Sequence, residues 1–392
     1  MNIPFNKPHL TGKEAHYMYQ AVAEGKLSGN GAFTKKCQHF FEERYGFKKC
    51  LLTTSCTDAL EMAAILCGIQ PGDEVIVPSY TFVSSALAFV RAGAKIVFAD
   101  SMQSNPNIDA EKIEALITPR TKVIVPVHYA GVACDMDRIM EIANKHNILV
   151  VEDAAQAIDS YYKGRPLGSI GHLSAFSFHE TKNIIAGEGG MLCINDERFI
   201  RRAEIIWEKG TNRAEFFRGE VNKYGWVDTG SSFLPSEVIA AFLWAQLEHL
   251  DEIQARRKHL WNLYYTNLSP IFSLMGSRKG FHSPLSGEQG GGFLPVIPSY
   301  ATNNAHMFYL VCNSLEERTA LIKQLKDNGV LAVFHYLSLH SSPYYTDKHD
   351  GRDLPECDRY ADCLVRLPMY YDLKDEEVVE ICKLIMDFVQ QA

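Results

Sequence analysis

The sequence predicts an α/β fold built on a largely parallel sheet, followed by a smaller C-terminal part. Apolar, β-branched runs alternate with helical stretches between Lys49 and Asn195, as expected when crossover helices join parallel strands. A length of 392 residues exceeds what one hydrophobic core usually organises. We therefore expect two domains, 1–250 with an N-terminal arm over about 1–14, and 251–392. The expected strands of the first domain are 51–52, 74–77, 95–98, 122–125, 148–151, 175–178 and 191–194.

Composition and charge narrow the class of protein. The chain is 46% hydrophobic and 22% charged, which is ordinary for a soluble enzyme, and its formal charge of −8 argues against a nucleic-acid partner. We expect no signal peptide and no membrane partner, because no charged start leads into a long apolar core and no apolar run approaches 18 residues. The ten cysteines are scattered without a C-x-x-C pair, which favours reduced thiols in a cytoplasmic protein.

Lys182 is the candidate reactive residue. It follows the apolar run 175–178 and precedes a glycine-rich turn, so its amine is expected at the end of a buried strand. Burial and cationic neighbours can lower a lysine pKa from about 10.4, which makes the amine a nucleophile or base able to form a Schiff base. A solvated lysine is the alternative. The strand-to-turn position, the hydroxyl of Ser177 and a carboxylate upstream count against it.

That carboxylate is Asp153, at the end of the apolar run that begins at Ile148. Such a run is typical of a central parallel strand, and ligands of open α/β sheets gather at the carboxyl ends of strands. A carboxylate there can keep a pyridine nitrogen protonated, as pyridoxal phosphate requires. Asp153 alone could equally be a helix cap or a turn former; Lys182, 29 residues later, favours the cofactor interpretation.

A cluster of hydroxyl residues precedes the apolar helix expected over 59–67. Ser55, Cys56 and Thr57 belong to this cluster, and hydroxyls with free amides at a helix N-terminus form a natural phosphate site. The glycines and lysine of a Walker loop are absent. Capping alone is the competing explanation, and Cys56 suits a small packing residue better than a nucleophile.

These motifs resemble the DegT/DnrJ/StrS-type sugar aminotransferases over nearly the whole chain. That family consists of pyridoxal-phosphate enzymes of aminotransferase fold type I, which act on nucleotide-linked keto sugars. The resemblance implies a mixed, mainly parallel seven-stranded sheet in the large domain and a smaller α+β C-terminal domain. The segments that carry it are 25–29, 78–82, 152–156, 177–182, 187–190 and 335–340. Three more segments, 127–131, 179–183 and 208–213, especially resemble one member of the family.

The resemblance also implies roles for single residues. Lys182 would hold the cofactor, Phe82 would pack on the cofactor's face, and Gln156 would approach its phenolic oxygen. Ser232 stands where many family members carry an asparagine that reaches the cofactor phosphate of a neighbouring subunit, so a homodimer with shared sites is expected. Phe82 could instead be a core residue.

Substrate contacts are expected in two further segments. The stretch 209–229 interleaves basic and aromatic residues, and Arg213 and Lys223 could bind a diphosphate there; a solvated or subunit-contacting loop is the alternative. His335 and His340 lie in a region that the resemblance places near the active site. Structural histidines are the competing account, and a zinc site is disfavoured because no third ligand stands at suitable spacing.

The C-terminal half begins with an expected helix that Ser236 caps and that extends to Ile253. The Gly-, Ser- and Pro-rich stretch 281–292 predicts a flexible connection. A strand over 306–312 and a helix over 315–328 are expected beyond it.

The expected activity is transfer of an amino group from L-glutamate to a nucleotide-linked keto sugar, with pyridoxamine phosphate formed between the two half-reactions. Amination at C4 of the sugar is preferred over C3. A dehydratase of the same fold has histidine where Lys182 stands, which disfavours that reaction here. A regulatory protein that binds pyridoxal phosphate without turnover is the alternative from another class.

Overall fold

The computed structural model describes residues 2–275 and 294–391. The connection predicted over 281–292 lies outside the described residues. Within the described ranges, no helix combines the length and the apolar character needed to cross a membrane.

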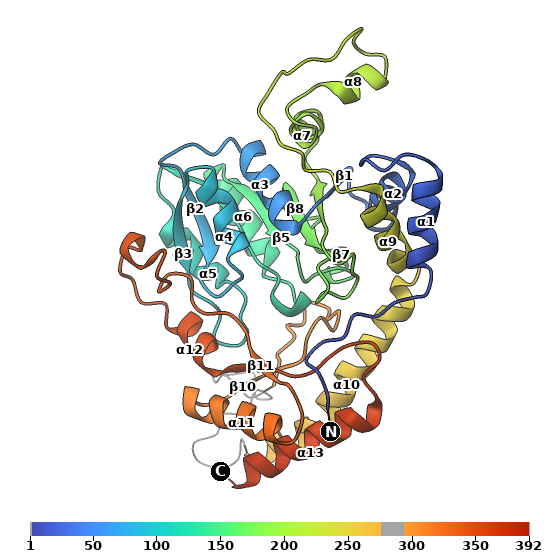
Figure 1. Cartoon of the computed structure of the whole chain (residues 1–392). Coiled ribbons are helices and arrows are strands. Elements are labelled where there is room, and N and C mark those ends of the chain that lie inside the picture. Colours follow the sequence, from blue (N-terminus) through green and yellow to red (C-terminus); the bar gives the residue numbers. More distant parts are fainter. Residues whose placement is uncertain (1, 276–293, 392) are drawn as a thin grey trace.

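A seven-stranded sheet forms the centre of the larger part of the chain (Figure 1). Its strand order is β1-β9-β8-β5-β4-β2-β3, and β9 runs antiparallel to both of its neighbours while the other pairs are parallel. The predicted mixed, mainly parallel sheet is therefore confirmed, and each predicted run overlaps one strand. The strands are β1 Lys49–Thr53, β2 Glu74–Pro78, β3 Lys95–Ala99, β4 Thr121–Ile124, β5 Leu149–Asp153, β8 Leu173–Ser177 and β9 Gly190–Ile194.

Helices cover both faces of this sheet. Successive strand residues point to opposite faces, so Leu51 and Val75 pack into one core with α3 and α4, while Cys50 and Ile76 pack into a second core with α2, α6 and α9. The helices are α1 Glu14–Ala23, α2 Ala32–Tyr45, α3 Cys56–Leu66, α4 Ser84–Arg91, α5 Ala110–Ile113, α6 Met136–His146, α7 Ile200–Trp207, α8 Arg213–Phe217 and α9 Glu237–Leu247; β6 Tyr161–Tyr162 and β7 Arg165–Pro166 form a small hairpin.

The helix predicted from Ser236 to Ile253 is two helices. Ser236 caps α9, because its Oγ accepts a hydrogen bond from the Ile239 amide. The chain turns after Leu247, where the His249 amide bonds back to the Gln246 carbonyl, and α10 Leu250–Met275 begins. The prediction of one helix was wrong because the apolar spacing continues through the turn and neither glycine nor proline marks it.

The C-terminal part has its own core, formed by α10, α11, α13 and a three-stranded antiparallel sheet of order β10-β12-β11. Ile3 also packs into this core and pairs with Val330. The strand predicted over 306–312 is shorter, because only Tyr309, Leu310 and Val311 pair with β12. The elements are β10 Tyr309–Val311, α11 Leu315–Asp327, β11 Val333–Phe334, α12 Pro355–Cys363, β12 Leu364–Arg366 and α13 Asp375–Gln391.

Candidate active site

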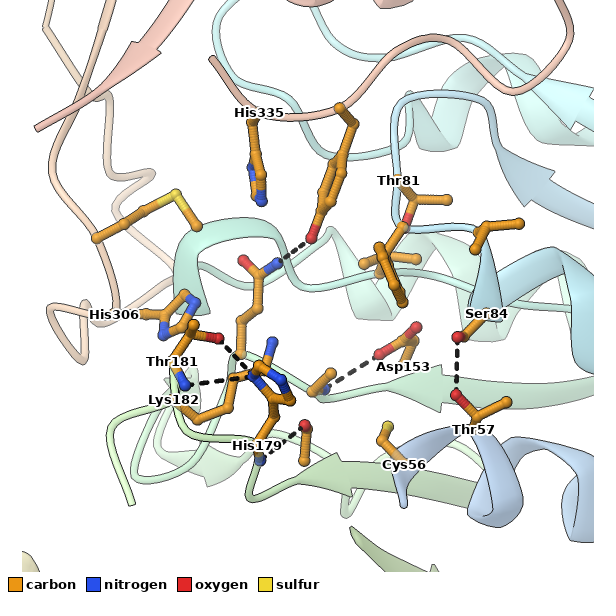
Figure 2. A pocket seen from close by; sticks show the side chains of 18 of the residues that line it. Cys56, Thr57, Thr81, Ser84, Asp153, His179, Thr181, Lys182, His306 and His335 are labelled. Carbon is orange, nitrogen blue, oxygen red and sulfur yellow. Dashed lines mark hydrogen bonds between the residues drawn. The ribbon is translucent and has the colours of Figure 1, made fainter. Parts of the chain in front are cut away.

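A cavity of about 890 Å³ lies where the carboxyl ends of the parallel strands meet the C-terminal part. This edge is the usual ligand site of open α/β sheets. Residues that follow β1, β2, β4, β5 and β8 line the cavity, and Tyr336 and Arg366 line it from the C-terminal part. His306 and His335 also line it from the C-terminal part (Figure 2). Of the residues predicted to bind the cofactor, the cavity brings together Ser55, Cys56, Thr57, Phe82, Asp153, Gln156, Ser177 and Lys182.

The N-terminus of α3 faces the cavity. Ser55 is the N-cap, and its Oγ accepts a hydrogen bond from the Asp58 amide at 3.1 Å. The amides of Cys56 and Thr57 occupy the first turn, where no carbonyl of the helix can accept from them. The Thr57 and Ser84 hydroxyls lie 2.8 Å apart beside them. This arrangement of free amides and hydroxyls suits a phosphate group.

Gly190 holds that turn in place. It begins β9 and pairs with Thr53 of β1 on one side and with Ser177 of β8 on the other. A Cβ at this position would overlap the backbone of Ser55 and Cys56. The close approach of β9 to the first turn of α3 therefore requires glycine.

Asp153 ends β5 as a buried carboxylate. Its Oδ2 accepts a hydrogen bond from Ser85 Oγ at 2.6 Å, and its Oδ1 accepts one from the Ala155 amide at 3.1 Å. Ser85 Oγ also lies 2.9 Å from Thr81 Oγ1. Two donors thus fix the carboxylate while its remaining lone pairs face the cavity that Asp153 lines.

Lys182 follows β8 in a tight turn, in which its amide donates to the His179 carbonyl at 2.9 Å. Burial lowers the pKa of the Lys182 amine, the nearby carboxylate of Asp153 opposes this shift, and the charge of Arg366 adds to it. A lowered pKa increases the fraction of free amine, which is the nucleophilic and basic form.

Gln156 connects two sides of the cavity. Its Oε1 accepts a hydrogen bond from the Ala130 amide at 2.6 Å, and its Nε2 donates to the Tyr336 hydroxyl at 3.0 Å. The Phe82 ring lies 6.1 Å from the Tyr336 ring and is 56% exposed. Phe82 is therefore a cavity-wall residue, and the alternative of a core position for it was wrong.

The cavity residues that were not found from the sequence include three polar ones of the C-terminal part: His306, Tyr336 and Arg366. His306 Nδ1 donates to Asn183 Oδ1 at 2.8 Å, next to Lys182 in the chain. Burial, together with the nearby charges of Lys182 and Arg257, lowers the pKa of His306 well below its usual value. Tyr336 lies in the segment 335–340 but was not singled out there, and no motif marks His306 or Arg366.

The two predicted histidines of 335–340 are placed differently. His335 lines the cavity, shares a hydrogen bond of 2.6 Å with the Tyr129 hydroxyl and stacks on Tyr336. Burial and the nearby charge of Arg366 lower the pKa of His335 well below its usual value. His340 lies outside the cavity lining and hydrogen-bonds Ser79 instead, which corrects the prediction that it contacts substrate within its own chain.

Ser232, Arg213 and Lys223 also lie outside the lining of this cavity. The segment 209–229 contains α8 and a bridge between Thr211 and Trp226, and it projects from the body of the chain (Figure 1). Its aromatic side chains are exposed to solvent, and the side chain of Trp226 is 84% exposed. Within one chain, these three predicted residues therefore do not line the cavity.

The sequence profile of the DegT/DnrJ/EryC1/StrS aminotransferase family matches residues 8–386. The chain belongs to this family. It is 32% identical over 402 aligned residues to the spore coat polysaccharide biosynthesis protein SpsC of Bacillus subtilis, with 100% of this chain and 98% of the relative covered. It is 34% identical over 345 residues to a GDP-perosamine synthase of Caulobacter vibrioides, covering 86% and 85%.

Solved structures agree with this assignment. A putative sugar aminotransferase of Streptococcus pneumoniae in its PLP form superposes with a TM-score of 0.87 at 26% identity, covering 100% of this chain and 99% of the other. The same protein in its PMP form gives a TM-score of 0.87, with both chains covered completely. The chain has the fold of the PLP-dependent aminotransferases, as predicted, and is a PLP-dependent sugar aminotransferase.

The residues around the cavity fit pyridoxal phosphate. The first turn of α3 offers free amides and hydroxyls for a phosphate, Asp153 offers a buried carboxylate for a protonated ring nitrogen, and Lys182 offers an amine for the aldehyde. These three groups surround one space. The donor set is therefore the one that this cofactor needs.

Proposed function

We propose that the chain transfers the amino group of L-glutamate to C4 of TDP-4-keto-6-deoxyglucose, giving TDP-4-amino-4,6-dideoxygalactose for a surface polysaccharide such as enterobacterial common antigen. The segments 127–131, 179–183 and 208–213 support this substrate, because they resemble those of the transaminase that makes this sugar. The relatives named for spore coat polysaccharide and for GDP-perosamine support a sugar for polysaccharide synthesis.

The observation that carries the proposal is the meeting of Lys182 and Asp153 in one cavity with the α3 turn. In our proposal, Cys56 and Thr57 bind the cofactor phosphate through their amides, assisted by the Ser55 and Thr57 hydroxyls. Asp153 holds the ring nitrogen in its protonated form. Bound pyridoxal phosphate then supplies an electron sink for the electrons of the donor's Cα–H bond.

Lys182 has two roles in this scheme. Its amine holds the cofactor before the donor arrives, and afterwards it accepts the proton from the donor's α-carbon as a general base. Its lowered pKa favours this, because the amine then spends more time unprotonated. Phe82 and Gln156 keep the cofactor ring oriented, the first by packing on its face and the second by approaching its phenolic oxygen.

The same cavity receives both substrates in turn, so the proposed kinetic scheme is ping-pong. Glutamate delivers its amine and leaves as the keto acid before the sugar nucleotide enters. His335 lines the cavity and is the proposed contact for the sugar among the predicted histidines.

A homodimer is part of the proposal. Ser232, Arg213 and Lys223 would serve the cavity of a partner subunit, since they do not line their own. The exposed side chains of Phe217 and Trp226 support a contact surface on this segment. Sedimentation of the holoenzyme tests this, and a Trp226→Ala variant should shift the population toward monomer with loss of activity.

The product of the reaction tests the substrate assignment. We expect the proton NMR spectrum, after incubation with pyridoxal phosphate, glutamate and TDP-4-keto-6-deoxyglucose, to show an axial amine at C4. An equatorial amine would reverse the facial preference, an amine at C3 would establish the alternative regiochemistry, and loss of a hydroxyl without amination would indicate a dehydratase. A GDP-linked keto sugar is the control substrate.

The cofactor spectrum tests the alternative of a regulatory protein. Glutamate alone should convert the absorbance of bound pyridoxal phosphate to that of pyridoxamine phosphate. If glutamate and other amino acids leave the spectrum unchanged, the chain binds the cofactor without turnover and the transaminase proposal fails.

A further inference from the structure

We propose that His306 positions Lys182: its Nε2 accepts a hydrogen bond from the ammonium group that Lys182 becomes when it takes the proton from the donor's α-carbon. The proposal rests on the proposed function, in which Lys182 is the general base, and it assigns a role to a residue outside the predicted motifs. His306 belongs to the C-terminal part and Lys182 to the turn after β8, and both side chains line one cavity (Figure 2).

Asn183 determines which nitrogen of the His306 ring carries a hydrogen. The Asn183 Nδ2 donates to the Asn304 backbone carbonyl at 2.9 Å and to Gln254 Oε1 at 2.8 Å. Because a backbone carbonyl can only accept, the amide nitrogen of Asn183 faces Asn304 and its Oδ1 faces His306. His306 Nδ1 lies 2.8 Å from that oxygen, so Nδ1 carries the hydrogen and donates it. In the neutral ring, Nε2 then has a free lone pair.

The backbone of His306 is held on both sides, so the ring keeps this orientation. The buried Arg257 donates from Nε to the Ala305 carbonyl at 3.1 Å and from Nη2 to the His306 carbonyl at 2.6 Å. The His306 amide donates to Asn304 Oδ1 at 3.0 Å. A rotation that exchanged the two ring nitrogens would break the bond between Nδ1 and Asn183.

The remaining nitrogen, Nε2, is available in the cavity. Within residues 2–275 and 294–391, the hydrogen bonds of His306 use its amide, its carbonyl and Nδ1. Burial lowers the pKa of His306, and among the nearby charges that lower it further, Lys182 has a larger effect than Arg257 or Arg366. A lowered pKa favours the neutral ring, which is the form that accepts a hydrogen bond at Nε2.

The protonated Lys182 needs such an acceptor. An ammonium group has three N–H donors, and both burial and the positive charge of Arg366 disfavour it here. The carboxylate of Asp153 favours the ammonium group, but it already accepts from Ser85 and, in the proposed function, serves the cofactor's ring nitrogen. A hydrogen bond from a charged donor is stronger than one between neutral groups. His306 Nε2 therefore stabilises the proton on Lys182 without adding a charge to the cavity.

His335 provides a contrast in the same cavity wall. Its Nδ1 lies 2.6 Å from the Tyr129 hydroxyl, and a hydroxyl can either donate or accept. This contact does not determine which ring nitrogen of His335 carries a hydrogen. The bond from His306 to an amide oxygen does, and for this reason we assign the acceptor role to His306.

Two substitutions separate this role from a structural one. Asparagine places its amide near the position of Nδ1 and keeps a group that bonds to Asn183, whereas glutamine reaches the position of Nε2. We expect His306→Asn to slow conversion of the bound cofactor by glutamate about 10- to 100-fold, because a hydrogen bond to a charged group is lost. His306→Gln should stay within about threefold of the wild type. Equal losses in the two variants, or the reverse order, would overturn the proposal.

The pKa of Lys182 in the apo-protein provides a measurement without turnover. The rate at which trinitrobenzenesulfonate modifies Lys182 at different pH values, followed by mass spectrometry, gives this pKa. An acceptor favours the ammonium form, so His306→Asn should lower the pKa of Lys182 by about one unit or more. The other ionisable groups near this amine, the Asp153 carboxylate, the Cys56 thiol and the Arg366 guanidinium, are the same in both proteins. An unchanged or raised pKa would overturn the role of His306.

Nitrogen-15 NMR of the histidine-labelled wild-type apo-protein tests the ring itself. We expect the His306 signals, assigned by their absence from His306→Asn, to show a hydrogen on Nδ1 and none on Nε2 at neutral pH. A hydrogen on Nε2, in the other tautomer or in the imidazolium ion, would overturn the proposal. Failure of the wild type to react with glutamate would instead overturn the proposed function, and the two apo-protein measurements would still decide whether His306 accepts from Lys182.

Discussion

Substitution of Gly190 by alanine should disable the phosphate site while leaving the rest of the cavity in place. The added Cβ would lie well inside 3.0 Å of the backbone of Ser55 and Cys56, whereas non-bonded carbon contacts settle at about 3.5–4.0 Å. The first turn of α3 must therefore retreat by roughly 1 Å, because Gly190 itself is fixed between β1 and β8.

The size of the effect follows from the hydrogen bonds that this retreat removes. A shift of roughly 1 Å takes an amide donor out of hydrogen-bond range of its acceptor. Two amides, those of Cys56 and Thr57, stand in the displaced turn. Each hydrogen bond to a charged group contributes about 1.5–3 kcal/mol, so the dissociation constant of pyridoxal phosphate should rise by about 10²- to 10⁴-fold.

Absorbance titration of the apo-protein with pyridoxal phosphate measures this constant, and thermal unfolding of the apo-protein reports on the fold. Gly189→Ala is the matched control, because its added Cβ would meet its nearest neighbour, Ala186 Cβ, at an ordinary 3.4 Å. Cofactor affinity of Gly190→Ala within about threefold of the wild type would refute the assignment of the α3 turn as the phosphate site.

Two further substitutions test the site, and a third tests a buried carboxylate next to Asp153 in the chain. Lys182→Arg keeps a charge but loses the reactive amine, and kcat should fall by at least about 10³-fold; wild-type-like turnover would contradict its catalytic role. Ser85→Ala removes the 2.6 Å hydrogen bond to Asp153 and should lower kcat about 10-fold, as steady-state assays would show. Glu152 is buried and accepts hydrogen bonds from His128 and three backbone amides. Burial raises the pKa of its carboxyl, but the hydrogen bonds outweigh burial and lower that pKa. The ionised Glu152 therefore stabilises the fold above its unfolded pKa of about 4.3, and this stabilisation is lost as the pH falls through the folded pKa. Glu152→Gln should lower the free energy of unfolding by about 3 kcal/mol at pH 7. The loss should be smaller below pH ~4, as unfolding measured at both pH values would show.

The sheet and the residues at its carboxyl edge could be predicted because they depend on local patterns. Asp153 and Lys182 each stand at the end of an apolar strand, and parallel strands bring such ends to one edge of a sheet. The Ser55 cap was recognisable because hydroxyl residues before an apolar helix favour its N-terminus. These residues can be placed from the sequence around them, without knowing which distant residues they contact.

The contribution of the C-terminal part could not be predicted in the same way. Arg366 comes 184 residues after Lys182 and follows two apolar residues of a short strand. Its place in the cavity wall depends on how the C-terminal part packs against the large sheet, and local sequence patterns do not state that. The turn between α9 and α10 was missed for a related reason, since neither glycine nor proline marks the bend at Glu248 and His249.

The position of β9 fixes the distance that a ligand must span. Because β9 runs antiparallel to both β1 and β8, those two strands end at the same edge of the sheet with β9 between them. The phosphate turn follows β1 and Lys182 follows β8, and β9 separates these two strands. Neighbouring strands are about 4.8 Å apart, so the two anchors begin roughly 10 Å from each other across the sheet. An aldehyde without a phosphate arm could reach the amine but would leave the turn empty, and inorganic phosphate would fill the turn without reaching the amine. The strand spacing therefore selects a molecule that carries both an aldehyde and a phosphate about 10 Å apart.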